Sequence, residues 1–389
     1  VYAGIKKKVK KDLMILASES PCVAAGVFTV NQIKAHCVVR NLSLIGQNKI
    51  SALIANSGNA NCMTGNQGEK DDYRMAGELA SALNVPSASV LTASTGVIGV
   101  PMPISRISEA ITGAVKNLSV GEGADKHSAE AILTTDTCIK NAHRSVKVKG
   151  GMVRIGAVTK GSGMIAPLMT SDGLPHATML AFITTDVKVS RSYLNALLKK
   201  CAHETFNAID VDGDMSTNDM VIALANGRSG ISLSDAKSKK AFEDAFFDLC
   251  DDLATQIVAD GEGATMFASI HVKRAASDQD ARAIAKAISE SNLVKTALHG
   301  RDANWGRIAA AAGAAQRQID YHSLSIFIEK MQVLKNGQPQ KFSESAAKKI
   351  LSKKSLTITV DLNLGKGSAV SKTCDLSYKY IEINADYRS

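Results

Sequence analysis

The chain has 389 residues, of which 45% are hydrophobic, 21% charged and only 4% aromatic, and its formal net charge is +9. This length suits two or three lobes with a substantial core of small aliphatic side chains. No apolar run approaches the ~18 residues that a membrane helix needs, so we expect no membrane-spanning segment. Because the first residue is Val1, a targeting peptide ahead of it stays open.

The seven cysteines are spread along the chain and none belongs to a C-x-x-C pair. This spacing favours reduced thiols in a reducing compartment over a disulfide framework or a zinc site. The positive charge raises the hypothesis of a nucleic-acid-binding protein, since five lysines lie between Lys6 and Lys11. We prefer a solvated edge there, because aromatic residues do not alternate with the basic ones and no nucleic-acid motif follows.

Strand-like and helix-like segments alternate along the chain, a pattern typical of an α/β protein. The pattern predicts strands at 51–56, 89–94, 179–183, 220–225, 265–272 and 356–364, and helices at 69–84, 103–118, 190–207, 234–259 and 278–290. Ser234 is the expected cap of the helix at 234–259, and Lys335 to Gln338 predicts a hairpin turn.

The stretch from Lys160 to Asp186 lies at the centre of this pattern. A glycine-punctuated segment gives way to the apolar strand at 179–183, so Thr178 stands where a loop enters a strand. A threonine there becomes a good nucleophile if the peptide bond before it is cut, because its freed α-amine can act as the base. On these residues alone, the simpler interpretation is that Thr178 begins a core strand.

This stretch resembles the self-cleaving region of the ornithine acetyltransferase family, also called glutamate N-acetyltransferase. In that family a lysine and a Gly-Ser-Gly-Met run precede an Ala-Thr-Met-Leu site, and the Ala-Thr bond is cut. Lys160, residues 161–164 and residues 177–180 match this pattern. The resemblance implies cleavage between Ala177 and Thr178.

Two departures from the family pattern precede the expected cleavage site. Leu168 stands where the family has Asn, and seven extra residues follow, Thr170 to His176. Thr170 is therefore a rival nucleophile. We prefer Thr178 because the strand follows it directly.

Further segments resemble the family in the same order along the chain. They are Asn56–Asn61, Ser94–Gly99, Thr134–Thr137, Gly261–Thr265, Arg301–Arg307 and the C-terminal stretch Cys374–Ser389. The resemblance implies Thr178 as nucleophile and substrate-binding residue, with Thr95 and Gly96 as the oxyanion hole. It also implies that Thr134, Lys160, Glu262, Asn384 and Ser389 bind substrate, and that Arg301–Arg307 is structural support.

The family also implies a fold and an assembly. We expect an αββα sandwich of the N-terminal-nucleophile-like type, divided into an α-chain (1–177) and a β-chain (178–389), with a smaller α/β lobe at roughly 275–360. Family members assemble from two α and two β chains. We expect no metal and no bound cofactor, and no nucleic-acid or membrane partner. The expected compartment is the cytoplasm, or the mitochondrion in a fungus or other eukaryote.

The implied reaction moves acetyl from N-acetylornithine to glutamate through an acetyl-Thr178 intermediate, a step of arginine biosynthesis. Acetyl-CoA as a second acetyl donor stays open. Two alternatives also stay open: a self-processing aminopeptidase or amidohydrolase that releases its product to water, and a basic nucleic-acid-binding protein without enzymatic activity.

Overall fold

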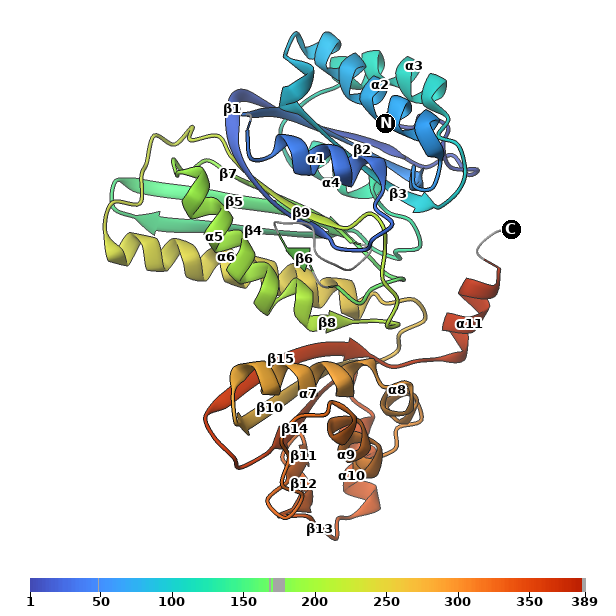
Figure 1. Cartoon of the computed structure of the whole chain (residues 1–389), viewed down its shortest axis with the longest axis vertical. Coiled ribbons are helices and arrows are strands. Elements are labelled where there is room, and N and C mark those ends of the chain that lie inside the picture. Colours follow the sequence, from blue (N-terminus) through green and yellow to red (C-terminus); the bar gives the residue numbers. More distant parts are fainter. Residues whose placement is uncertain (48, 168, 171–178, 387–389) are drawn as a thin grey trace. The chain divides into compact units, whose positions relative to one another are not determined.

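The structure, a computed structural model, describes residues 1–47, 49–167, 169–170 and 179–386 (Figure 1). The chain divides into two compact units, a larger one made of residues 1–207 and 215–257 and a smaller one made of residues 208–214 and 258–389. The lobe expected at 275–360 lies within the smaller unit. Within the described ranges, helices long and apolar enough to cross a bilayer do not occur.

One mixed sheet organises the larger unit, with the strand order β3-β2-β1-β9-β7-β5-β4 and β6 paired to β1. The β2–β3 and β7–β9 pairs are parallel, and the other pairs are antiparallel. The strands are β1 (Leu13–Thr29), β2 (Ile50–Asn59), β3 (Val90–Val97), β4 (Lys140–Val148), β5 (Gly151–Lys160), β6 (Met169–Thr170), β7 (Leu180–Thr185) and β9 (Met220–Ala225).

Strand β1 changes partner along its length. Residues 13–17 pair with β2, and residues 23–28 pair with β9, with an irregular stretch between them. The sheet therefore folds into two layers, and one apolar cluster contains Leu53 and Leu91 from the first layer and Phe182 and Ile222 from the second. Burial between two layers explains why the central strands are almost continuously apolar.

Helices cover both outer faces of this folded sheet (Figure 1). Met75, Leu79 and Ile107 of α2 and α3 pack on β2 and β3, and α5 and α6 cover the strands of the second layer. This is the predicted αββα sandwich. The helices are α1 (His36–Leu44), α2 (Gly65–Leu83), α3 (Ile104–Lys116), α4 (Glu122–Ala131), α5 (Arg191–Glu204) and α6 (Ala236–Ala259), and short 3₁₀ turns occur at Ser87–Ser89 and Phe206–Ala208.

The smaller unit has a second mixed sheet, ordered β13-β12-β11-β14-β10-β15-β8. Ile284 and Ile288 on α7 share an apolar core with the inward faces of β10 and β14. Its strands are β8 (Ile209–Asp210), β10 (Phe267–Ala275), β11 (Ser325–Ile328), β12 (Met331–Lys335), β13 (Gln338–Pro339), β14 (Ser355–Asp361) and β15 (Gly367–Cys374). Its helices are α7 (Asp278–Glu290), α8 (Asn292–His299), α9 (Trp305–Ala314), α10 (Glu344–Leu351) and α11 (Tyr378–Ala385).

Local signals in the sequence account for several element ends. The predicted turn is confirmed, since Asn336 and Gly337 have φ angles of +46° and +71° and join β12 to β13. The prediction that Ser234 caps α6 is wrong. The Asp235 carboxylate accepts the backbone N–H of Ser238 at 2.9 Å and so caps this helix one residue later.

Candidate active site

The end of β3 carries the two predicted oxyanion residues, Thr95 and Gly96. Strands β2 and β3 run parallel, with Gly58 opposite Gly96. Gly96 has a φ of +136°, and a Cβ atom there would lie 2.4 Å from the carbonyl carbon of Gly58. Only glycine fits this close approach of two backbones. A backbone N–H group at such a strand end is the kind of donor that an oxyanion hole uses.

The asparagine-rich end of β2 fixes the end of β3 in place. The Ser94 hydroxyl donates to Asn56 Oδ1 at 2.7 Å, and Asn56 Nδ2 donates to the carbonyl of Asn59 at 2.9 Å. Asn59 Nδ2 in turn donates to the carbonyl of Val100, beyond β3, at 3.0 Å. The family-like motif at 56–61 is therefore a scaffold for the predicted oxyanion residues.

Asn218, which the sequence analysis missed, joins this scaffold to β9. Its Nδ2 donates to the carbonyl of Ser94 and to the carbonyl of Ala60, both at 2.7 Å. Asn218 is 2% exposed and directly precedes Asp219 and the apolar strand β9. A polar run before an apolar strand is a weak signal, since such runs usually mark exposed turns.

Lys160, a predicted substrate-binding residue, lies at the end of β5 and is 2% exposed. Its Nζ donates to Thr95 Oγ1 at 3.3 Å. Leu180, the first residue of β7, pairs with Lys160 across the sheet. The structure thus brings together three segments that the family resemblance had grouped: the end of β3, the end of β5 and the start of β7.

Asp136 links Lys160 to Thr134, another predicted substrate-binding residue. Asp136 Oδ1 accepts Lys140 Nζ at 2.7 Å and the N–H of Gly161 at 2.8 Å, and its Oδ2 accepts the N–H of Thr134 at 2.9 Å. Burial alone would raise the pKa of Asp136, but the charges of Lys160 and Lys140 lower that pKa well below its usual range. Asp136 is therefore ionised, and its hydrogen bonds hold the carboxylate next to the backbone of Thr134 and of Gly161, the residue after Lys160.

A second buried acid, Asp219, lies at the start of β9 and was also missed. Its side chain is 0% exposed, and neither carboxylate oxygen has a hydrogen-bond partner among the described residues. Burial raises the pKa of Asp219 well above its usual range, although the charge of Lys160 opposes this rise.

The predicted nucleophile Thr178, the cleavage site Ala177–Thr178 and Ser389 lie outside the described residues. Met179, which follows Thr178 in the chain, is described. It is 0% exposed, and its carbonyl accepts the N–H of Met220 at 3.0 Å. Strand β7 therefore begins beside β9 directly after the expected cleavage site.

Glu262 and Asn384, the two predicted substrate-binding residues of the smaller unit that are described, contact each other. Asn384 Nδ2 on α11 donates to Glu262 Oε2 at 2.7 Å. A Cβ atom on Gly263 would lie 2.6 Å from the backbone N of Tyr380, so this glycine lets α11 approach the turn at 261–263. The structure thus brings together two residues 122 positions apart.

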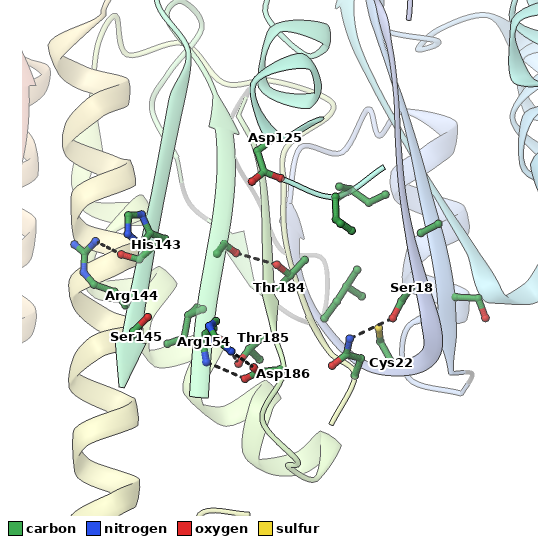
Figure 2. Close-up of a pocket in the computed structure, with 18 residues that line it drawn as sticks. Ser18, Cys22, Asp125, His143, Arg144, Ser145, Arg154, Thr184, Thr185 and Asp186 are labelled. Carbon is green, nitrogen blue, oxygen red and sulfur yellow. Dashed lines mark hydrogen bonds and ion pairs between the residues drawn. The ribbon is translucent and has the colours of Figure 1, made fainter. Parts of the chain in front are cut away.

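A cavity of about 500 Å³ lies elsewhere in the larger unit (Figure 2). It opens between the two sheet layers, with Ser18 and Cys22 of β1 on one side and Ser145 and Thr184 of β4 and β7 on the other. Thr184 lies at the opposite end of β7 from Leu180, and the lining of this cavity includes none of the predicted site residues that the structure describes. The cavity is therefore separate from the candidate active site.

The described residues contain no cluster of three or more His, Cys, Asp or Glu side chains that could hold a metal ion. Whether the reaction needs a metal or a cofactor stays a prediction from the sequence.

Comparison with known proteins identifies the family. The model of the ArgJ family matches residues 1–389. The arginine biosynthesis bifunctional protein ArgJ of Thermotoga neapolitana is 46% identical over 400 residues, which cover 100% of this chain and 98% of that protein. The protein of the same name from Symbiobacterium thermophilum is 44% identical, with 98% and 93% covered.

A solved structure is similar as well. The crystal structure of arginine biosynthesis bifunctional protein argJ from Bacillus halodurans shares 42% sequence identity, with a TM-score of 0.52. The match covers 54% of this chain and 99% of that chain. With its αββα sandwich and its match over the full length, the chain belongs to the ArgJ family.

Proposed function

We propose that the chain cuts itself between Ala177 and Thr178 and then moves acetyl from N-acetylornithine to glutamate. The contact of Lys160 Nζ with Thr95 Oγ1 at 3.3 Å carries this proposal. This contact joins the cation predicted to bind substrate, Lys160, to the hydroxyl predicted to stabilise the oxyanion, Thr95. Lys160 is also the residue that pairs with Leu180 at the start of β7. The names of the relatives support a role in arginine biosynthesis.

The coverage of the solved structure supports the cleavage. Cutting after Ala177 leaves a β-chain of 389 − 177 = 212 residues, which is 54% of the 389 residues. The Bacillus halodurans chain, matched over 99% of its own length, likewise covers 54% of this chain. A separate chain of this size is what a cut precursor would yield.

The chemistry of the proposed reaction follows from an N-terminal threonine. The freed α-amine of Thr178 takes the hydroxyl proton while the hydroxyl oxygen bonds to the acetyl carbon of N-acetylornithine. Thr95 Oγ1 and the Gly96 N–H stabilise the resulting oxyanion, and loss of one such donor typically costs about 2.7–4 kcal/mol of barrier. Ornithine leaves with the proton, and the amino group of glutamate then attacks the acetyl ester. The bond between the acetyl carbon and the Thr178 oxygen breaks, the α-amine passes the proton lost by glutamate to that oxygen, and N-acetylglutamate leaves.

The remaining predicted residues would hold the amino-acid parts of donor and acceptor. Lys160 supplies a cation for a carboxylate, Thr134 a hydroxyl, and Glu262 an anion for an ammonium group. Asn384 and Ser389 are the other predicted substrate-binding residues. Acetyl-CoA as a second acetyl donor is part of the proposal. An assembly of two α and two β chains in the cytoplasm completes the proposal, and the bacterial relatives support that compartment.

Intact-mass spectrometry of the denatured, purified chain tests the proposal. We expect two fragments that join at Ala177 and Thr178, and a single uncut, inactive chain for Thr178→Ala. Cleavage before Thr170 would make that residue the nucleophile instead. A processed and active Thr178→Ala variant would refute the assignment.

A second experiment compares glutamate with water as the acceptor of the acetyl group, and so separates acetyl transfer from hydrolysis. Enzyme incubated with labelled N-acetylornithine is expected to pass the label to glutamate as N-acetylglutamate. Release of the label only as acetate would instead favour the amidohydrolase alternative.

A further inference from the structure

The lysine-rich segment at 6–11 is exposed for most of its length, as the sequence predicted, but Lys6 departs from that prediction. Lys7, Lys8 and Lys10 are exposed, whereas Lys6 is half-buried. The Lys6 Nζ donates to the carbonyl of Lys11 at 2.8 Å. Because an ammonium group has three N–H donors, two of them remain for another partner.

The backbone of Lys6 is held at the end of β2 by the buried residue Asp12. The Asp12 carboxylate is 0% exposed and accepts the N–H groups of Ile5 and Lys6 at 2.7 Å and 3.1 Å. The Asp12 carbonyl accepts the N–H of Ser57, on β2, at 2.9 Å. Lys6 therefore has a defined position in the larger unit, unlike a lysine in a solvated run.

The side chain of Lys6 lies next to the predicted oxyanion residues. A Cβ atom on Gly58 would lie 3.2 Å from Lys6 Cγ, so the aliphatic stem of the lysine packs on this glycine. Gly58 is directly opposite Gly96 in the β2–β3 ladder. Lys6 thus lies one strand away from the oxyanion residues at the end of β3.

The ammonium group of Lys6 lacks a carboxylate at ion-pair distance among the described residues. The nearby acid Asp12 accepts backbone N–H groups, and Asp136 pairs with Lys140 at 2.7 Å. Burial lowers the pKa of Lys6 to about 8, and the charge of Asp12 opposes that fall. Weaker effects on this pKa come from the charges of Lys10, Asp136 and Lys160. A half-buried cation that has no counterion is typical of a site for an anionic ligand.

We propose that Lys6 binds the side-chain carboxylate of the acceptor glutamate and so selects this acceptor. The inference rests on the proposed function. N-acetylornithine carries one carboxylate, whereas glutamate carries two. Lys160 is the cation proposed for the carboxylate that donor and acceptor share. The second carboxylate, which only the acceptor has, needs a second cation when it leaves water, and Lys6 supplies it with two N–H donors.

The Lys6→Met variant tests this role, because methionine keeps an unbranched stem against Gly58 and removes the charge. Exchange of labelled ornithine into N-acetylornithine needs no glutamate in a ping-pong reaction, so its rate should stay unchanged. The kcat/KM for glutamate should fall roughly 10- to 150-fold, mainly through a higher KM. The matched control is Lys7→Met, at an exposed lysine, which should alter neither rate. An equal loss in exchange and transfer, or no loss in either, would overturn the proposal.

Glutamine as acceptor shows whether the charge of Lys6 is what matters. Glutamine has nearly the same shape as glutamate but lacks the second carboxylate. The wild-type chain should therefore prefer glutamate, and Lys6→Met should lose most of that preference. If Lys6→Met kept the full preference, another group would bind the side-chain carboxylate and the proposal would be wrong.

Calorimetric binding needs no turnover, so it separates this inference from the proposed function. The wild-type chain should bind glutamate more tightly than glutamine by roughly tenfold or more. Lys6→Arg, which keeps the charge, should retain a preference for glutamate. Equal affinities of the wild-type chain for the two amino acids would overturn the role of Lys6. A wild-type chain that binds glutamate selectively but catalyses neither exchange nor transfer would instead refute the proposed function.

Discussion

Asp375 in the smaller unit and Asp219 in the larger unit are both almost fully buried, but their surroundings are opposite. Asp375 accepts the N–H groups of Thr265 and Met266 and the Thr265 hydroxyl, each at 2.7 Å, and contacts His299 Nδ1 at 2.8 Å. Asp219 has no such partner among the described residues. We infer that a fully paired buried acid supports the fold, whereas an unpaired one marks chemistry.

The pKa values of Asp375 and Asp219 are also shifted in opposite directions. Burial would raise the pKa of Asp375, but its hydrogen bonds with Thr265 and His299 lower it overall. Burial raises the pKa of Asp219, and the charge of Lys160 offsets that rise only in part. We therefore expect substitution of Asp375 to change stability and substitution of Asp219 to change catalysis.

Asp375→Ala should have the largest effect on stability. It would leave the N–H groups of Thr265 and Met266 and the ring of His299 without their acceptor, and breaking a buried network of this kind costs about 3–5 kcal/mol. Urea unfolding measures the loss. The control is Asp278→Ala, because the exposed Asp278 accepts one N–H, from Ser368 at 2.9 Å. If Asp375→Ala and Asp278→Ala lost equal free energy of unfolding, the buried hydrogen-bond network of Asp375 would not stabilise the fold more than an exposed carboxylate does.

Lys160→Met should affect catalysis more than stability. The variant loses a charged donor to Thr95 Oγ1 and the cation proposed for a substrate carboxylate, a change of about 1.5–3 kcal/mol or roughly 10- to 150-fold in kcat/KM. Lys140→Met is the matched comparison, since Lys140 is also buried and ion-paired to Asp136 at 2.7 Å. If Lys140→Met lowers kcat/KM as much, Lys160 acts only by holding the fold.

The sequence predicted the regular elements where apolar spacing was strong. Strand β9 and helix α7 have the predicted bounds, 220–225 and 278–290. Strand β1 was missed because it changes partner along its length, so its burial does not follow one simple alternation. The hairpin of β4 and β5 was missed as well, since exposed and charged residues interrupt its apolar pattern.

The candidate site could be predicted only where a family motif covered it. The resemblance grouped Thr95 with Lys160, and the structure places them in contact. Asn218, Asp219 and the ionic role of Asp136 were missed, because a short polar run in sequence ordinarily means solvent exposure. Their burial arises from packing between distant strands, which local sequence does not encode.

Asp136→Asn gives the smallest of these effects and sharpens the comparison within the larger unit. The pKa of Asp136 is lowered in the folded state, so its stabilisation is present above the unfolded pKa of about 3.9 and is lost as pH falls below that value. The variant should be less stable than wild type at pH 7, by on the order of 2 kcal/mol. The gap should begin to narrow below about pH 4 and should close only as pH falls through the lowered pKa of Asp136. Urea midpoints from pH 3 to pH 8 measure this gap. Asp219, whose pKa is raised, should give the opposite slope in the uncut Thr178→Ala chain. If the stability contributions of Asp136 and Asp219 changed in the same direction with pH, the distinction between a paired and an unpaired buried carboxyl group would be wrong.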